Sequence, residues 1–201
     1  MKKLLLSLAL IMMPVAAYAD NLPVYVSVGS GITMTNNSNF NDGNASGSID
    51  IKNSENFSGA VGTSFLKDTR TELEISYRSA DLSSAYVNGI GGAQVGGSVD
   101  TWTYLANVYY DFLDGQPIRP YVSAGIGAAT HRGTLTVGGI SASANDTEFA
   151  YQAGLGASYS LTKNVSLWGG YRYLGSSDAN FQGLKASYGA NEINAGLRYK
   201  F

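Results

Sequence analysis

Eight segments of this chain alternate apolar and polar residues with a period of two, and this alternation constrains the fold more than any other feature. Successive side chains of a β-strand point to opposite faces, so the alternation predicts strands with two unlike faces. No helical periodicity recurs, and after residue 20 no apolar run is long enough for a membrane-spanning helix. The predicted strands cover approximately residues 24–34, 56–66, 70–80, 101–112, 119–130, 148–161, 165–174 and 192–201.

The connections between these segments alternate strictly between short and long. The short connections are 67–69, 113–118 and 162–164, and the long ones, rich in Ser, Asn, Gly and Asp, lie near 35–55, 81–100, 131–147 and 175–190. A compact soluble domain rarely keeps several long structureless loops. We therefore predict an all-β, eight-stranded antiparallel up-and-down barrel, with four long loops at one end and three short turns at the other.

The composition of the two faces predicts which of them meets lipid. One face carries aromatic residues near both strand ends: Phe57, Trp102, Tyr104, Phe149 and Tyr173 at one end, and Phe65, Tyr110, Phe112, Tyr159, Tyr199 and Phe201 at the other. Two such bands are typical of a transmembrane β-barrel. A soluble, lipocalin-like periplasmic barrel would instead bury its apolar face, and the two aromatic bands favour the membrane.

The opposite face is mostly Gly, Ser, Thr and Asn, with a few charged residues. The candidate interior charge network consists of Glu74, Arg78, Asp111, Arg172, Glu192 and Arg198. Because buried charges are tolerated only when paired, we expect Glu74 to pair with Arg198 or Arg78, and Arg172 with Glu192. Eight strands leave an interior too narrow for an open channel, so the prediction is a polar, plugged interior. The alternative is that these charges gate a small pore.

The first residues, MKKLLLSLALIMMPVAAYAD, have the basic start, apolar run and small-residue site of a secretory signal peptide. We predict cleavage between Ala19 and Asp20, which divides the chain into a signal peptide, 1–19, and a barrel domain, 20–201. An N-terminal membrane anchor is the alternative, although the apolar run is short for a spanning helix.

Charge and residue counts exclude several kinds of site. The chain has 13 basic and 15 acidic side chains, and losing Lys2 and Lys3 with the leader leaves an excess of four acidic ones, which disfavours nucleic acid. The absence of Cys excludes thiol chemistry and Cys-based zinc motifs, and one His cannot build a metal site from imidazoles. The Gly-rich pieces VGSGIT and NGIGGAQVGG lack the GK[ST] ending of a phosphate-binding loop. We expect no cofactor and no metal.

A barrel enzyme that modifies lipid A is the catalytic alternative. It would need Ser, His and a carboxylate within reach of one another. His131 ends the fifth segment, whereas Ser141, Ser143 and Glu148 fall on the following loop and the next strand. No Ser closely follows a His on one strand, so we expect His131 to be a membrane-interface residue and the protein not to be an enzyme.

The segments RTELEISYR, RPYVSAGIGAA, LWGGYRYL and NEINAGLRYKF resemble strands of the opacity-protein-like, OmpA-type outer-membrane β-barrel family of Gram-negative bacteria, which includes surface antigens. The resemblance covers residues 20–201. It implies a monomer among outer-membrane lipid and lipopolysaccharide, with periplasmic termini and extracellular long loops. It also implies that Leu197, Tyr199 and Phe201 form the signal read by the barrel-assembly machinery.

The resulting function is a non-enzymatic surface protein of the cell envelope, whose loops meet a host or the environment. A small porin-like channel remains the alternative. The acidic loop residues Asp42, Asp50, Glu55, Asp81, Asp100, Asp146, Glu148 and Asp178 outnumber the basic Lys52, Arg132 and Lys185. This excess argues against acidic ligands such as heparin and allows a cationic or protein partner, although a solvated rim is the simpler explanation of the same charges.

Overall fold

The computed structural model describes residues 23–35, 38–41, 46–51, 53–87, 91–93, 96–137, 140–176, 179–181, 184–186 and 189–201. The predicted leader and its cleavage site at Ala19 and Asp20 lie outside these residues. Eight long strands form a wall: β1 (Val24–Thr35), β4 (Ser54–Leu66), β5 (Thr69–Val87), β7 (Gly96–Asp111), β8 (Ile118–Val137), β9 (Ile140–Ser160), β10 (Val165–Ser176) and β13 (Gly189–Lys200). Five short strands accompany them: β2 (Ser38–Asn41), β3 (Ser46–Ile51), β6 (Gly91–Ala93), β11 (Ala179–Phe181) and β12 (Leu184–Ala186).

The eight long strands form a closed antiparallel ring. Each pairs with its two neighbours in the order β1, β4, β5, β7, β8, β9, β10 and β13, and β13 pairs back onto β1. The closing ladder runs from Tyr25 opposite Lys200 to Thr35 opposite Ala190. A closed ring leaves no sheet edge, which is the condition for a sheet to sit in lipid. The predicted eight-stranded antiparallel barrel is confirmed.

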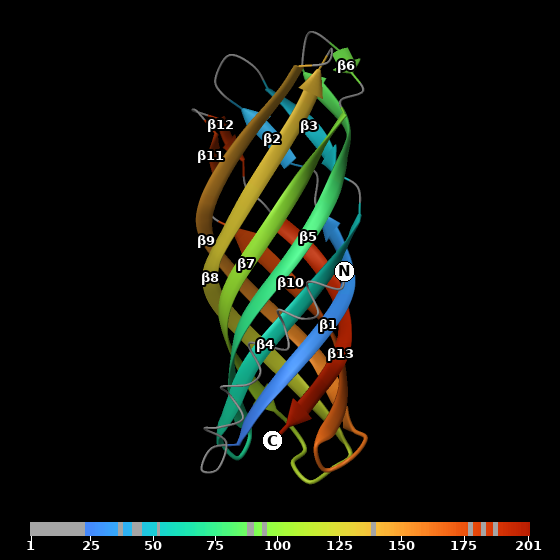
Figure 1. The fold of residues 1–201 in the computed structure, drawn as a ribbon, viewed down its shortest axis with the longest axis vertical. Helices are drawn as coiled ribbons and strands as arrows, with labels where there is room; N and C mark the ends of the chain where they lie inside the picture. The colour runs from blue at the N-terminus through green and yellow to red at the C-terminus, as the bar shows by residue number, and fades with distance from the viewer. Residues whose placement is uncertain are drawn as a thin grey trace.

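The two ends of the barrel differ. At the turn end, short connections link β4 to β5, β7 to β8 and β9 to β10, and β13 finishes beside the start of β1, where the Phe201 amide donates to the Val24 carbonyl at 3.1 Å. At the opposite end rises the crown, made of the five short strands and the outer parts of β5, β7, β8 and β9 (Figure 1). The outer part of β5 pairs with β3 and β6.

The predicted loops at 81–100 and 131–147 are largely strand. The ladder between β8 and β9 continues without a break from the wall to Val137 opposite Ile140, and β5 extends to Val87. The prediction ended these strands where the apolar alternation ends. Backbone pairing does not require an apolar face, so a ladder can continue into water after the alternation has stopped.

The apolar faces of the wall point outward. Ile126 and Leu155 are 59% and 60% exposed, whereas Thr103 and Glu192 on the inner face are 0% exposed. Nine of the eleven aromatic residues of the two predicted bands are exposed: Phe57, Trp102, Tyr104 and Phe149 on the crown side, and Tyr110, Phe112, Tyr159, Tyr199 and Phe201 at the turn end. Tyr173 is half-buried, and the side chain of Phe65 is not described. Within the described residues, no helix has the length and apolar character needed to cross a membrane.

Candidate functional site

The interior of the barrel is built from alternate residues of each strand. On β5 the inward positions Arg70, Glu72, Glu74, Ser76 and Arg78 are all buried. One strand thus lines much of the interior with charge, and its partners come from strands around the ring. These partners form two separate clusters, one above the other along the barrel.

The crown-side cluster consists of Glu74, Arg78, Arg172 and Glu192. The Arg172 guanidinium lies 2.7 Å from Glu74 Oε1 through Nη1 and 2.6 Å from Glu192 Oε2 through Nε. Arg78 Nη2 lies 3.0 Å from Glu192 Oε1. β10, which carries Arg172, is separated from β5 by three strands in either direction around the ring, so the bridge from Arg172 to Glu74 crosses the full width of the interior.

Neutral side chains complete the hydrogen bonding of this cluster. Thr33 Oγ1 donates to Glu192 at 3.2 Å and accepts from Asn56 Nδ2 at 3.0 Å. Asn107 Nδ2 donates to Glu74 Oε2 at 3.3 Å. Both carboxylates therefore have partners besides Arg172, as buried charges require.

The turn-side cluster consists of Arg70, Glu72, Asp111 and Arg198. Arg70 lies 2.6 Å from Glu72 through Nη1 and 2.9 Å from Asp111 through Nε, and Arg198 Nη2 lies 3.6 Å from Glu72. The Tyr25 hydroxyl donates to Glu72 Oε1 at 2.9 Å. This cluster joins three strands of the barrel, β5, β7 and β13, close to the turn end.

Aromatic rings stack on the arginines of the turn-side cluster. The Arg70 guanidinium carbon lies 3.7 Å from the ring centre of Tyr109 and 5.2 Å from that of Tyr121. The Arg198 carbon lies 5.0 Å from the ring centre of Tyr25. Cation–π contacts of this kind are strongest when water is excluded. These three tyrosine rings thus lie inside the barrel, beside the arginines of the turn-side cluster.

All six residues of the predicted charge network lie inside the barrel. The expected pairing of Arg172 with Glu192 is present, but the pairing of Glu74 with Arg198 or Arg78 was wrong. Arg172 reaches Glu74 from β10, on the opposite side of the ring from β5, whereas Arg198 lies 3.6 Å from Glu72.

The predicted network lacked Arg70 and Glu72, and sequence reasoning also missed the inward tyrosines Tyr25, Tyr109 and Tyr121. A usable signal was present: each tyrosine occupies the polar phase of its strand's alternation, as Tyr109 does beside the outward Tyr110. Aromatic residues in the polar phase of a membrane barrel are therefore candidates for interior filling.

His131 also lies inside the barrel rather than on its lipid-facing surface. It follows Thr130, the register partner of Trp102 in the crown-side aromatic band, and is 5% exposed, with Nδ1 2.9 Å from Thr101 Oγ1. Burial and the nearby Arg78 charge lower the pKa of His131 to about 4, and Asp146 partly opposes this shift. The imidazole is therefore neutral at pH 7.

The positions of His131, Ser143 and Glu148 give no support to the alternative of an enzyme that modifies lipid A. The backbone register sets Ser143 opposite Thr134, three residues beyond His131 on β8, and the side chains of Ser141 and Ser143 lie outside the description. Glu148 is buried and accepts from the Ser176 hydroxyl at 2.9 Å. Within the described part of the chain, no three His, Asp or Glu side chains group as metal ligands would.

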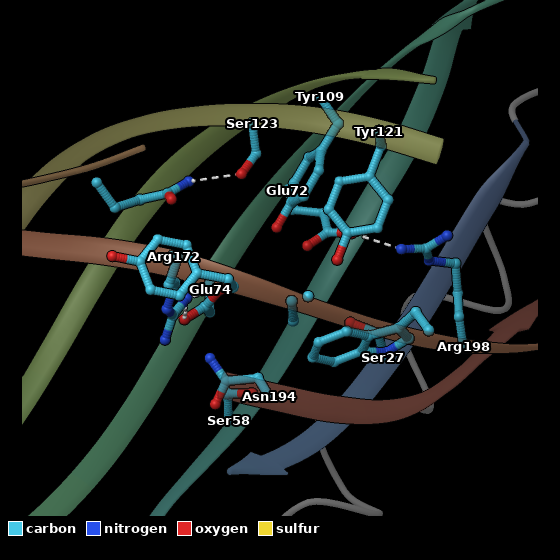
Figure 2. Close-up of a pocket in the computed structure, with 15 residues that line it drawn as sticks. Ser27, Ser58, Glu72, Glu74, Tyr109, Tyr121, Ser123, Arg172, Asn194 and Arg198 are labelled. Carbon is cyan, nitrogen blue, oxygen red and sulfur yellow. Dashed lines mark hydrogen bonds and ion pairs between the residues drawn. The ribbon is translucent and has the colours of Figure 1, made fainter. Parts of the chain in front are cut away.

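Between the two clusters lies a cavity of about 40 Å³. Figure 2 shows Arg172 with Glu74 on one side of it, apart from Glu72 and Tyr121, and the Arg198 guanidinium directed toward the latter pair. The cavity is lined by side chains of both clusters together with small residues and one indole, that of Trp168.

Comparison with known proteins places this geometry in context. The family model described as "Outer membrane protein beta-barrel domain" matches residues 4–201. Outer membrane protein PagN of Salmonella typhimurium is 36% identical over 99 residues, which cover 46% of this chain and 41% of PagN, so the match spans less than half of either protein. A putative adhesin of Rickettsia bellii is 26% identical over 100% of this chain and 95% of its own length.

A solved structure shares the fold. The crystal structure of Neisserial surface protein A matches with a TM-score of 0.58 at 21% identity, over 89% of this chain and 97% of that one. At this identity the likeness concerns the barrel alone.

Proposed function

The chain belongs to the outer membrane protein beta-barrel domain family, and from that premise we propose that it is a non-enzymatic surface protein whose crown contacts a host or the environment. It is a bacterial outer-membrane β-barrel. In the proposed orientation the turn end and both termini face the periplasm, and the crown faces outward. Cleavage after Ala19 would release the leader during export.

The observation that carries the proposal is the length of four strands. β5, β7, β8 and β9 contain 19, 16, 20 and 21 residues, whereas a tilted strand needs only about 9–11 to span a bilayer. Their outer parts, with the five short strands, build an ordered surface that spanning does not require. Function concentrates in such connections, and the similarity to putative adhesins supports the same assignment.

The acidic character expected for the loops is only partly a property of the surface. Glu148 is buried inside, and Asp100 accepts a hydrogen bond from the Tyr77 hydroxyl at 2.8 Å. Asp42, Lys52 and Asp178 lie outside the described residues, and the side chains of Asp50, Asp81 and Lys185 are not described. The exposed Glu55 and Arg132 carry opposite charges, so we propose a protein partner rather than a strongly cationic one.

The interior supports a role other than ion conduction. Two charge clusters and three inward tyrosines fill it, and the Arg172–Glu74 bridge crosses its width. A porin-like role would need a continuous aqueous path past both clusters. Catalysis on membrane lipid would need reactive groups on the outer face, and His131 lies on the inner one.

The end of β13 supports a second proposed role, as the signal that the barrel-assembly machinery recognises. Tyr199 and Phe201 are exposed on the outer face, with ring centres 5.2 Å apart. With Leu197 they offer an apolar strip at the turn end. Deleting Phe201 should lower the amount of heat-modifiable barrel in outer-membrane fractions more than it lowers the stability of the barrel that assembles. Equal amounts of both proteins would show that the ring only packs.

The test of the surface function shortens the crown without touching the wall. Residues 134–143 are removed in register and Gly133 is joined to Ala144 by an Asn-Gly turn, which suits a two-residue hairpin. Bacteria carrying the shortened and the full barrel at equal surface amounts are compared for attachment to cultured host cells and immobilised matrix proteins. The control variant carries Ile126→Leu on the lipid face.

The proposal expects attachment to fall with the shortened crown and to persist with the control. Parallel variants shorten the other crown connections one at a time. Undiminished attachment in every shortened variant, or equal attachment of bacteria without the protein, would overturn the surface function.

A further inference from the structure

Leu113, in the connection between β7 and β8, has a backbone conformation that is unusual for its residue type. Its φ is 56°, and among the residues that the structure describes it is the only one other than glycine with a positive φ. In this left-handed region Cβ approaches the following carbonyl oxygen too closely, so glycine or asparagine normally occupies such positions. A leucine here is strained, and such strain persists only where the surrounding structure fixes it.

The Leu113 side chain gains little from the rest of the protein. It is 62% exposed, so most of its apolar surface contacts no other described residue. In water the position would combine a strained backbone with an apolar side chain that contributes almost nothing to stability. Contact with an apolar environment outside the chain would offset the strain.

The connection folds into a tight turn immediately after Leu113. The Gln116 amide donates to the Leu113 carbonyl at 3.2 Å, and Gly115, with a φ of 80°, supplies the second left-handed position. The connection is one of the loops at the bottom of Figure 1. Leu113 is therefore the first residue of a hydrogen-bonded turn at the turn end of the barrel.

Backbone hydrogen bonds hold this connection on both sides. The Asp111 amide donates to the Asp68 carbonyl, in the connection between β4 and β5, at 2.8 Å. The Ser160 amide, at the end of β9, donates to the Pro117 carbonyl at 3.0 Å. These bonds to both neighbouring hairpins fix the turn, so Leu113 is presented in its strained conformation instead of relaxing out of it.

The charge next to Leu113 in the sequence is paired. Asp114 follows it directly, and the Asp114 carboxylate lies 3.2 Å from Lys67 Nζ and 3.5 Å from Arg119 Nη2. Moving an unpaired charge toward hydrocarbon is costly, and pairing lowers that cost. The turn can therefore approach lipid without bringing an uncompensated carboxylate with it.

The lipid-facing surface of the wall continues directly to Leu113. Phe112, the residue before it, belongs to the turn-end aromatic band, and its ring centre lies 4.9 Å from that of Tyr110. Ile118, at the other end of the connection, is also exposed and stands opposite Tyr159 of the same band. One residue moves the chain by about 3.8 Å, so Leu113 lies at the border of the band. This continuity favours lipid over a periplasmic protein as its partner.

We propose that Leu113 is a membrane anchor, whose side chain lies among the acyl chains of the lipid leaflet at the turn end. The strained, fixed turn holds the leucine there and sets how deeply this end of the barrel sits in the bilayer. The ligand is phospholipid hydrocarbon. The anchor goes beyond the proposed surface function and does not depend on what the crown contacts.

A spin label tests where position 113 lies. The chain contains no Cys, so Leu113→Cys carries a label at one position only, and Gln116→Cys, at an exposed polar position of the same turn, is the matched control. Full-length, heat-modifiable barrels in phospholipid vesicles are measured for collision of the label with oxygen, which concentrates in hydrocarbon, and with a water-soluble nickel chelate. We expect the ratio of oxygen to chelate collisions to be several-fold higher at 113 than at 116.

Equal ratios at the two positions would overturn the anchor. This outcome includes a turn that contacts a periplasmic protein instead, because the vesicles contain only the barrel and the label would then meet water.

Substitutions of Leu113 test the same contact without a label. Leu113→Ala keeps the strained backbone and removes most of the apolar side chain, whereas Leu113→Met keeps both. In urea unfolding from vesicles, Leu113→Ala should lower the folding equilibrium constant about tenfold and Leu113→Met should change it little. A Leu113→Ala barrel as stable as the parent would overturn the anchor. Leu113→Gly, which also relieves the strain, should be more stable than Leu113→Ala, and the reverse order would contradict the strained turn.

Discussion

The inner and outer surfaces of the barrel are made by the same eight strands, yet different forces hold them. Outward side chains such as Ile126 and Leu155 need only be apolar, because contact with lipid requires no specific hydrogen-bonding or ionic partner. Inward side chains such as Arg172 and Glu192 are stable only because specific groups meet them across the interior. Neighbouring residues on one strand should therefore differ sharply in which substitutions they tolerate without loss of stability.

The largest expected loss of stability comes from replacing Arg172 on the inner surface. Arg172→Leu leaves Glu74 and Glu192 buried without their shared partner, and losing one member of a buried ion pair costs about 3–5 kcal/mol of unfolding free energy. The matched control is the outward neighbour, Tyr171→Phe, which loses only the hydrogen bond from its hydroxyl to Asn191. Urea unfolding in lipid vesicles measures both. Equal effects would remove the distinction between the surfaces.

The next effect tests the outer surface at Ile126. An arginine on the lipid face near the bilayer midplane costs about 2–4 kcal/mol, whereas Ile126→Leu changes little. The same urea titration compares Ile126→Arg with Ile126→Leu. An Ile126→Arg barrel as stable as the parent would show that this face does not lie in hydrocarbon.

Two glycines, one on the inner and one on the outer surface, allow the same comparison with smaller expected losses of stability. Gly29→Ala forces the inward Trp168 ring to move, and overpacking of this kind costs about 1–3 kcal/mol. Gly169 faces outward, and a Cβ there meets nothing closer than the Asn194 carbonyl at 3.6 Å, so Gly169→Ala should be nearly neutral. Thermal unfolding followed by gel mobility ranks the two. A larger loss at Gly169 would contradict the assignment of faces.

The last expected effect is a pH dependence from His131, which is absent at pH 7 and grows only as the pH falls. Because its folded pKa is lowered from 6.5 to about 4, the buried neutral imidazole contributes stability that is complete above pH 6.5 and declines as pH falls toward 4. His131→Gln should flatten the stability profile between pH 7 and pH 4. The contrast is measured by urea unfolding at several pH values, and parallel profiles for both proteins would show that the histidine does not titrate in this window.

The wall was predictable from the sequence because lipid outside and polar groups inside impose a strict alternation on every spanning residue. The crown was not, because the outer part of β8 pairs with β9 through the backbone and its sequence shows no such alternation. The inward position of the six charged residues followed from strand phase alone. Their partners did not, since the choice of Arg172 for Glu74 depends on which residues stand opposite across the interior, and that depends on the register of the closed ring.

The most direct test of two unlike surfaces uses the two tryptophans, one on each. Trp102→Phe and Trp168→Phe barrels are placed in vesicles whose acyl chains carry bromine, and fluorescence quenching is measured with and without iodide in the water. We predict that brominated lipid quenches Trp102 strongly and that neither quencher reaches Trp168. Quenching of Trp168 by aqueous iodide, or failure of brominated lipid to quench Trp102, would contradict a lipid-facing wall around a closed interior.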